Sequence, residues 1–322
     1  MCITHTNLVS FKGSETREGM SLGSVTARDD LASSVVQFQR ILVATDFSAG
    51  ARAALDYALD IGLPFQSKIF LVHAIPTGLS NYVPPEASEE VIRQANSFAA
   101  NQMQRLVQES GCAGSVQEEI LCGERVWPLL QEFAANNEVD LIVLGTHGRT
   151  AVKQRLLGPV AEEIFRLAER PILTVGPRSE KNKGEAPLVR RILYATNFKP
   201  HAERAASIAY ALEREQGAKL TVLHVVEEPA ETPKSAHKFV EEFMIRRMKK
   251  GIPLVCVGKC EPALQVRFGE PAEQILKSAG EEDSDLIVLG MRSGKHATGN
   301  LPSAVAYKLA CQAPCPVLTV RH

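Results

Sequence analysis

The sequence predicts an α/β fold made of two similar domains in tandem. Short apolar runs alternate with segments whose apolar residues recur at helical spacing, which is typical of a mostly parallel sheet covered by helices on both faces. A length of 322 residues suits two domains better than one. Four sequence blocks also recur in the same order, which indicates an internal duplication.

In the first half, each expected strand is a short apolar run, and helical periodicity resumes after an intervening turn or loop. The expected strands of this half cover residues 40–48, 68–75, 115–123, 141–145 and 171–175. The expected helices cover residues 51–63, about 86–110, 124–136 and 158–168.

The second half repeats the first with two different shifts. The first two blocks are displaced by 191 − 40 = 151 residues and the last two by 290 − 145 = 145, so 151 − 145 = 6 residues are lost between the second and fourth strands. The matched pairs are RILVATDFS (40–48) with RILYATNFK (191–199), IFLVHAI (69–75) with LTVLHVV (220–226), EVDLIVLG (138–145) with DSDLIVLG (283–290), and PILTV (171–175) with PVLTV (316–320). The expected organisation is a disordered tail over residues 1–38, a first domain over 39–177, a linker over 178–189 and a second domain over 190–322.

The composition limits the classes of function. With 36 basic and 37 acidic residues the net charge is −1, which argues against nucleic acid or a membrane surface as the main partner. No apolar run approaches the ~18–20 residues that span a bilayer, and the first residues lack the pattern of a signal peptide. Seven cysteines without a dense framework predict reduced thiols and a cytoplasmic location.

The stretch over residues 140–160 carries the strongest functional signal. It reads as a buried strand, a loop with Gly145, Gly148 and Gly158, and the start of a helix. The unpaired N–H groups and the dipole of the first helical turn favour phosphate at this place. Four residues that can carry positive charge lie in the same loop: His147, Arg149, Lys153 and Arg155.

Taken together, these motifs resemble the universal stress protein family. The shared features are a first strand ending in TDFS, an apolar strand ending in His, DLIVLGTHGR, GPVAEEI and PILTV. They span both halves, so the chain is identified as a tandem member. The resemblance implies Rossmann-like, adenine nucleotide alpha hydrolase-like domains, each an open five-stranded parallel sheet of strand order 3-2-1-4-5. Ligands of such sheets bind in the crevice where the winding reverses, between the first and fourth strands.

The resemblance also implies an adenine nucleotide site, with ATP as the cofactor, in the first domain. Nucleotide-binding members carry G-x2-G-x9-G-[Ser/Thr], and Gly145, Gly148 and Gly158 fit this spacing. Pro159 stands at the Ser/Thr position and removes an N–H and a hydroxyl, so weakened phosphate binding is expected. The N–H groups of Gly158 and Val160 are expected to remain available. The candidate site residues are Ala44, Thr45, Asp46, Ala74, Leu144, Gly145, Thr146, His147, Gly148, Arg149, Gly158, Pro159 and Val160.

The resemblance assigns the adenosine end of the nucleotide to the turn after the first strand. Main-chain groups of Ala44, Thr45 and Ala74 would contact the base. Asp46 would accept a hydrogen bond from a ribose hydroxyl, or it would cap the following helix together with Ser48. Both interpretations of Asp46 remain open on the sequence.

The second domain departs further from the motif. Gly290 fits, but Ser293 and Ser303 replace the later glycines, and Asn197 stands where the first domain has Asp46. A side chain obstructs the close approach of backbone to phosphate, so we expect a degenerate second site. The alternative for both domains is a loop that merely connects a strand to a helix.

Other conspicuous residues are expected to be structural. His73 and His224 end the second strand of their halves, where a hydrogen-bonded role is commoner than catalysis. His147 could meet phosphate, but the sequence places no partner carboxylate beside it. Trp127 is expected in the core.

Metal and membrane binding receive little support. Cys256 and Cys260, and likewise Cys311 and Cys315, lack the matching His/Cys set that a zinc site needs. The amphipathic helix over residues 238–250 is expected to pack on its own sheet rather than on a membrane.

Three functions are open on the sequence. The first is a stress-response regulatory module that binds adenine nucleotide; the alternative is a tandem scaffold for protein interaction or another small ligand. The third is slow phosphohydrolysis, although no P-loop or nucleophile–base pair predicts an enzyme. The duplication predicts an intramolecular pseudo-dimer, and the resemblance implies that residues 171–175 pair with 316–320, which would cover two apolar edge strands; a further homodimer is open.

Overall fold

The computed structural model describes residues 38–77, 85–112, 114–147, 156–179, 189–227, 234–251, 261–292 and 304–321. Nearly all of the expected tail and most of the expected linker lie outside these residues. Among the candidate site residues, Gly148 and Arg149 also lie outside them, as do Ser293 and Ser303 of the second half.

Each half forms a parallel sheet with the strand order that the family resemblance implies. The first half pairs in the order β3-β2-β1-β4-β5, and the second in the order β8-β7-β6-β9-β10. The strands are β1 (Arg40–Ala44), β2 (Lys68–Pro76), β3 (Val116–Gly123), β4 (Leu141–Gly145), β5 (Ile172–Val175), β6 (Arg191–Thr196), β7 (Lys219–Val226), β8 (Ala263–Phe268), β9 (Leu286–Met291) and β10 (Val317–Arg321).

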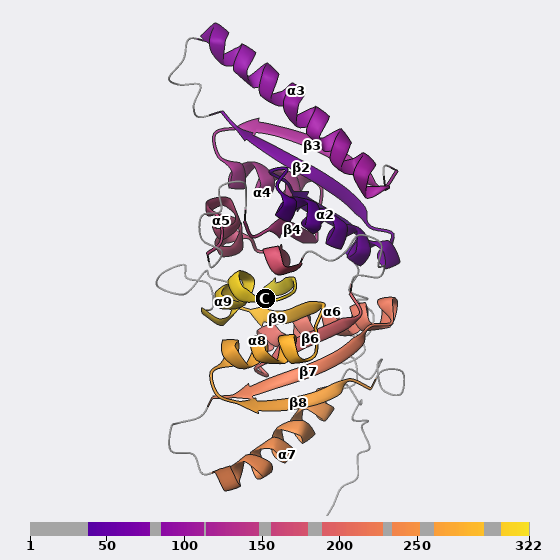
Figure 1. Ribbon diagram of the computed structural model, residues 1–322, viewed down its shortest axis with the longest axis vertical. Coiled ribbons are helices and arrows are strands. Elements are labelled where there is room, and N and C mark those ends of the chain that lie inside the picture. Colours follow the sequence, from indigo (N-terminus) through magenta and orange to yellow (C-terminus); the bar gives the residue numbers. More distant parts are fainter. Residues whose placement is uncertain are drawn as a thin grey trace, which may run out of the picture. The chain divides into compact units, whose positions relative to one another are not determined.

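Helices cover both faces of the strands (Figure 1). One apolar cluster contains α2 (Ala49–Gly62), α3 (Pro85–Ser110), α6 (Pro200–Gln216) and α7 (Lys234–Lys250). The cluster on the opposite face contains α4 (Val126–Asn136), α5 (Pro159–Leu167), α8 (Pro271–Glu281) and α9 (Ala304–Gln312). Two short 3₁₀ helices, η1 (Leu63–Phe65) and η3 (Pro177–Ser179), complete the described elements. Both clusters draw residues from both halves, so the apolar core is continuous along the chain.

The two halves join through their last strands. β5 and β10 pair antiparallel, with Leu318 opposite Leu173, and the result is one ten-stranded sheet. The hydroxyl of Thr174 donates to the carbonyl of Val317 at 3.2 Å, and the hydroxyl of Thr319 donates to that of Ile172 at 3.3 Å. The expected pairing of these strands is confirmed. Because each edge strand covers the other, neither is left open to pair with another chain.

A carboxylate, partly buried in the first half and buried in the second, fixes the start of each crevice-forming strand pair. Asp140, just before β4, accepts hydrogen bonds from the N–H groups of Gln39 and Arg40 at 2.7 and 3.1 Å. Asp285 does the same for Arg190 and Arg191 at 3.0 and 2.9 Å. Burial raises the pKa of the Asp140 carboxyl, and the hydrogen bonds from Arg40 and Gln39 oppose that shift. These contacts hold the amino ends of β1 and β4 side by side, and the candidate site lies at the carboxyl ends of the same two strands.

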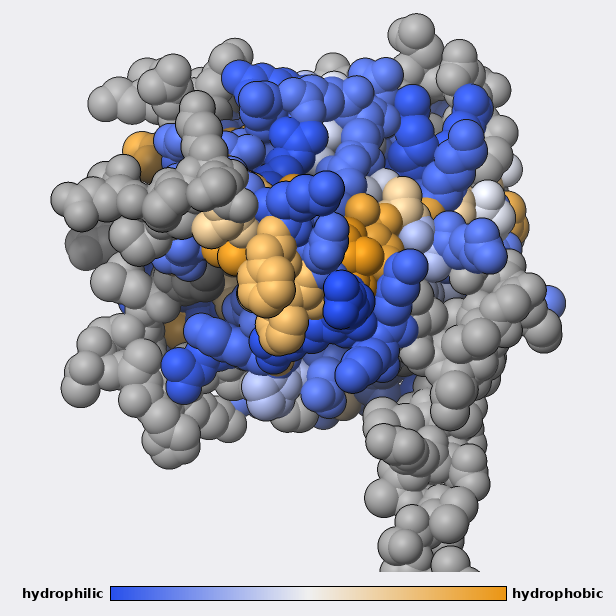
Figure 2. All heavy atoms as spheres, turned by 90° about the horizontal axis from the view of Figure 1, so that it is seen from below, coloured by the Kyte–Doolittle hydropathy of each residue, from blue (hydrophilic) through white to orange (hydrophobic). Residues whose placement is uncertain are grey.

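The helix α7 packs on β8 through an apolar face that includes buried Met248. Its outer face leaves Phe239 74% and Phe243 55% exposed. Figure 2, which views the molecule from the α7 side, shows apolar side chains standing among hydrophilic ones. Trp127 is buried in α4 as expected. No helix among the described residues is long and apolar enough to cross a membrane.

Candidate functional site

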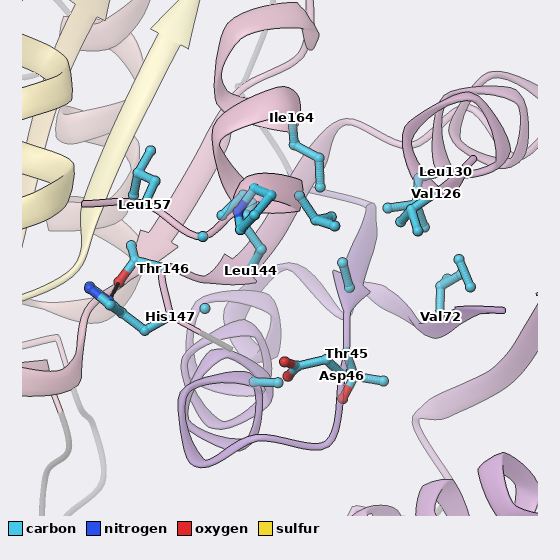
Figure 3. A pocket seen from close by; sticks show the side chains of 18 of the residues that line it. Thr45, Asp46, Val72, Val126, Leu130, Leu144, Thr146, His147, Leu157 and Ile164 are labelled. Atoms are coloured by element: carbon cyan, nitrogen blue, oxygen red, sulfur yellow. Dashed lines mark hydrogen bonds between the residues drawn. The ribbon is translucent and has the colours of Figure 1, made fainter. Parts of the chain in front are cut away.

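A cavity of about 600 Å³ opens at the carboxyl ends of β1 and β4 (Figure 3). The described part of the predicted site gathers here. Eleven of the thirteen candidates line the cavity: Ala44, Thr45, Asp46, Ala74, Leu144, Gly145, Thr146, His147, Gly158, Pro159 and Val160. The structure therefore brings together two segments that lie about a hundred residues apart in the chain. The other two candidates, Gly148 and Arg149, fall outside the described residues.

The cavity has an apolar wall that the sequence analysis missed. Val72 of β2, Val126 and Leu130 of α4, and Ile164 of α5 line it. In the sequence these residues look like ordinary core positions, because their spacing is that of buried faces. The one signal that could have identified these wall residues is their position near the carboxyl ends of the strands. A flat aromatic base fits such a wall, since apolar surface recognises a ring without needing a specific donor.

The turn after β1 is built by side chains that bond the backbone two or three residues ahead. Asp46 Oδ1 accepts from the N–H of Ser48 at 3.0 Å, and Ser48 Oγ accepts from the N–H of Ala51 at 3.2 Å. Ser48 is thus the N-cap of α2, and Asp46 lies two residues before it. Among the described residues, no hydrogen bond reaches the second oxygen of Asp46, whose side chain borders the cavity (Figure 3).

The main chain of Thr45 is less available than the resemblance implies. Its N–H donates to the carbonyl of Val72 at 2.9 Å, and its carbonyl accepts from Nδ1 of His73 at 2.7 Å. Because a carbonyl oxygen can only accept, the proton of His73 sits on Nδ1. The imidazole also packs on the ring of Phe47 at 4.4 Å between centroids. His73 therefore holds the turn, although it also borders the cavity.

The second half repeats this turn. Nδ1 of His224 lies 2.8 Å from the carbonyl of Thr196, and its ring packs on Phe198 at 4.5 Å. Burial lowers the pKa of His224, and nearby Arg247 lowers it further. The structural interpretation of both histidines agrees with these contacts.

Gly145 is required by the approach of α2, whatever binds in the cavity. A Cβ atom there would lie 2.8 Å from the carbonyl carbon of Gly50 and 3.0 Å from the nitrogen of Ala51. The equivalent Gly290 is still tighter, because an added Cβ would overlap the carbonyl of His201. The first glycine of the motif is thus explained by backbone packing in both halves.

The N-terminus of α5 forms the opposite side of the cavity from Asp46. Its first intrahelical bond runs from the N–H of Glu162 to the carbonyl of Gly158 at 2.8 Å. The N–H of Gly158 donates to the carbonyl of Thr146 at 2.9 Å, so the expectation that it is available for phosphate is wrong. Helix geometry instead leaves the N–H groups of Val160 and Ala161 without an intrahelical acceptor. Pro159, at the first helical position, has none to offer.

The side chains after β4 are occupied with one another. Thr146 is fully buried, and its hydroxyl lies 2.7 Å from Nδ1 of His147 and 3.4 Å from the carbonyl of Val175. The second ring nitrogen of His147 is buried and has no hydrogen-bond partner among the described residues. Figure 3 shows the ring beside Thr146 and not beside Asp46.

In the second half, larger side chains stand at the corresponding places. His201 takes the position of Gly50 (201 − 151 = 50), is 8% exposed, and lies with Nε2 3.3 Å from the side-chain nitrogen of Asn197. Met291 takes the position of Thr146 (291 − 145 = 146) and is buried. The described residues at the carboxyl ends of β6 and β9 therefore carry larger side chains than their counterparts in the first half.

No metal site is apparent in the part of the chain that the structure describes. It contains no group of three or more His, Cys, Asp or Glu residues that could hold an ion. The four described cysteines are free thiols: Cys112, Cys122, Cys311 and Cys315. The other conspicuous cysteine pair, Cys256 and Cys260, lies outside the described residues.

Comparison with known proteins gives the same result for both halves. The model of the Universal stress protein family matches residues 37–176 and again residues 189–321. A universal stress protein from Mycolicibacterium smegmatis is 26% identical over 298 residues, which cover 87% of this chain and 96% of that protein. A universal stress protein from Thermus aquaticus is 37% identical over 142 residues, which cover 42% of this chain and all of that protein.

A solved structure supports the architecture alone. The crystal structure of a universal stress protein from Archaeoglobus fulgidus superposes with a TM-score of 0.62 at 18% identity. The match covers 88% of this chain and 99% of that one, so the likeness in fold extends over both halves.

Proposed function

The chain belongs to the universal stress protein family, and from this premise we propose that it is a stress-response regulatory module that holds adenine nucleotide, first of all ATP, in its first domain. Binding would tie the turn at Asp46 to the N-terminus of α5, and the module would signal through that conformation or through partners. We propose that the module is not an enzyme. We also propose that it is cytoplasmic, because its described free thiols would stay reduced there.

One observation carries the proposal: a single cavity has a carboxylate on one side and a helix N-terminus on the other. Asp46 has an oxygen to accept from ribose hydroxyls, and the N–H groups of Val160 and Ala161 can donate to phosphate. The apolar wall at Val72 and Leu130 suits the base. A volume of about 600 Å³ is within the usual range of small-molecule sites.

For the second domain we propose the alternative function, a scaffold for protein interaction or another small ligand. His201 and Asn197 bond to each other where the first half has Gly50 and Asp46. Asn197 also keeps the structural bond of its counterpart, because its Oδ1 accepts from the N–H of Lys199 at 3.1 Å. Asparagine can therefore form this turn, but it offers no carboxylate that could accept from ribose hydroxyls. A homodimer of the whole chain stays a prediction.

Calorimetric titration with ATP tests the proposal through one pair of variants. Asp46→Asn keeps the oxygen that accepts from Ser48 and removes only the charge, so it should weaken ATP by about tenfold or more without unfolding the protein. Asn197→Asp is the matched control and should leave the affinity unchanged. Absence of heat at millimolar ATP for the unaltered protein would contradict the proposal in favour of the scaffold.

A further inference from the structure

The helix α5, which forms one side of the candidate site, is held at both of its ends by side chains of the second half. Just before the helix, buried Leu157 belongs to the same apolar cluster as Cys311 of α9, and Tyr307 of α9 packs against that cluster. Near its other end, the carbonyl of Phe165 accepts from the guanidinium of Arg321, the last residue of β10. The ring of Phe165 also packs edge-to-face on Tyr307, with 6.2 Å between centroids.

The contact of Arg321 satisfies a group that the helix itself leaves open. The last intrahelical bond of α5 runs from the N–H of Ala168 to the carbonyl of Ile164 at 2.9 Å, so the next carbonyl, of Phe165, has no helical partner. A cation at this end also complements the helix dipole. Arg321 is only 5% exposed, and its Nε has no hydrogen-bond partner among the described residues. A buried guanidinium is costly unless it is compensated, and here the carbonyl of Phe165 and the charge of Glu169 compensate it.

The contacts at Leu157 act at the mouth of the cavity. Leu157 lines the cavity and is followed by Gly158, whose N–H is fixed by Thr146. The next residues, Val160 and Ala161, carry the two N–H groups proposed to meet phosphate. A short helix moves as one body, because its backbone bonds link each turn to the next. Any displacement of α5 against the sheet would therefore move these donors relative to Asp46.

The arrangement is not repeated in the opposite direction. At a shift of 145 residues, the counterparts of Tyr307, Cys311 and Arg321 are Glu162, Arg166 and Gly176. Glycine has no side chain that could reach a helix end. One partial equivalent exists: the exposed Arg178 donates to the carbonyl of Gln312 at the end of α9 at 3.1 Å.

From these contacts we propose that Arg321, Tyr307 and Cys311 are positioning residues for the nucleotide site of the first domain. The second domain thus acts as a fixed clamp that holds α5 of the first domain in place. This gives a role to a half whose own site departs from the nucleotide motif. The inference rests on the proposed function, because the clamp acts on binding only when nucleotide occupies the cavity. The clamp itself can be measured without any ligand.

The test uses full-length protein with Arg321→Met, which keeps most of the side-chain length and removes the donor and the charge. Without nucleotide, hydrogen exchange of the α5 amides should accelerate by about tenfold, while exchange in β1 and α2 stays unchanged. ATP affinity should fall by about tenfold, and Arg321→Lys, which keeps a charged donor, should restore part of both. Arg178→Met, the matched control, removes the donor to the end of α9 and should change neither quantity.

Three outcomes decide between the possibilities. Unchanged α5 exchange in folded Arg321→Met would overturn the clamp, and so would an equal loss of ATP affinity in Arg178→Met. If the unaltered protein binds no ATP while α5 exchange accelerates locally, the proposed function fails and the clamp stands only as a structural device. Should Arg321→Met not fold, Tyr307→Leu keeps an apolar side chain but removes the ring that packs on Phe165, and it is judged by the same two readouts.

Discussion

At the scale of single residues, the glycine after β4 and its counterpart after β9 serve helix packing before they serve any ligand. The backbone of α2 passes so close to Gly145 that a methyl group would meet it at 2.8 Å, and α6 leaves even less room at Gly290. This explains why the second half keeps this glycine while serines replace the later ones. The first glycine of the motif is therefore poor evidence for nucleotide on its own.

Alanine substitutions at these two glycines separate a role in helix packing from a role in ligand binding. Gly145→Ala and Gly290→Ala should each lower the free energy of unfolding by about 1–3 kcal/mol, because overpacking against backbone forces a shift. Gly280→Ala is the control: Gly280 lies in α8 with no atom within 4 Å of an added Cβ, so alanine should stabilise by about 0.5–1 kcal/mol. Urea denaturation without ligand gives the comparison. Unchanged stability at both Gly145 and Gly290 would show that packing does not require them.

His224 gives the second prediction at this scale. Its folded-state pKa lies below the ordinary 6.5, first because it is buried. Between these two pKa values the unfolded chain binds more protons than the folded one, so stability falls as the pH drops below about 6.5. His224→Gln can still donate to Thr196 but cannot titrate, and should show a smaller loss of stability between pH 7.5 and 5.5. Parallel pH profiles for the two proteins, measured by urea denaturation, would refute this assignment.

At the scale of elements, α5 decides how well phosphate is held. The helix begins with Pro159, and its first available N–H groups belong to Val160 and Ala161. Restoring a hydroxyl and an N–H at the first position should therefore add contacts that the present chain lacks. The helix dipole is already directed at the cavity.

Pro159→Ser should tighten ATP binding by about three- to tenfold, the worth of one added hydrogen bond. Pro271→Ser, at the equivalent first position of α8 and outside the cavity lining, should leave the affinity unaltered. Calorimetric titration measures both. Equal or weaker binding by Pro159→Ser would mean that phosphate does not approach this helix end.

At the scale of the whole molecule, the antiparallel contact of β5 with β10 makes two repeats into one cooperative sheet. Leu318 is fully buried opposite Leu173, and each apolar cluster contains residues of both halves.

Because the two halves share this sheet and core, we expect one unfolding transition for the whole chain in calorimetry. Leu318→Ala should lower the free energy of unfolding by about 2–5 kcal/mol and leave a single transition. Leu63→Ala, at a position 78% exposed, should not lower it. Two separate transitions, with only the later half affected, would contradict this prediction.

Much of this arrangement was predictable from the sequence, and the limits have physical reasons. The strand and helix order followed from periodicity, the pairing of 171–175 with 316–320 followed from the family resemblance, and eleven candidate residues meet at one cavity. The wall at Val126 and Leu130 was missed because a cavity wall and a core have the same spacing. The hold of Arg321 on Phe165 joins residues 156 positions apart, and no local pattern records such a contact.

The central claim, one adenine nucleotide per chain and only in the first domain, is tested most directly by locating the bound base. Full-length protein would be photolabelled with 8-azido-ATP, and the labelled peptides mapped by mass spectrometry, with unlabelled ATP as competitor. The account predicts about one label per chain, in peptides of the wall formed by β2 and α4, and protection by ATP. Label in β6, β7 and α8 to the same extent, or no competition by ATP, would contradict it.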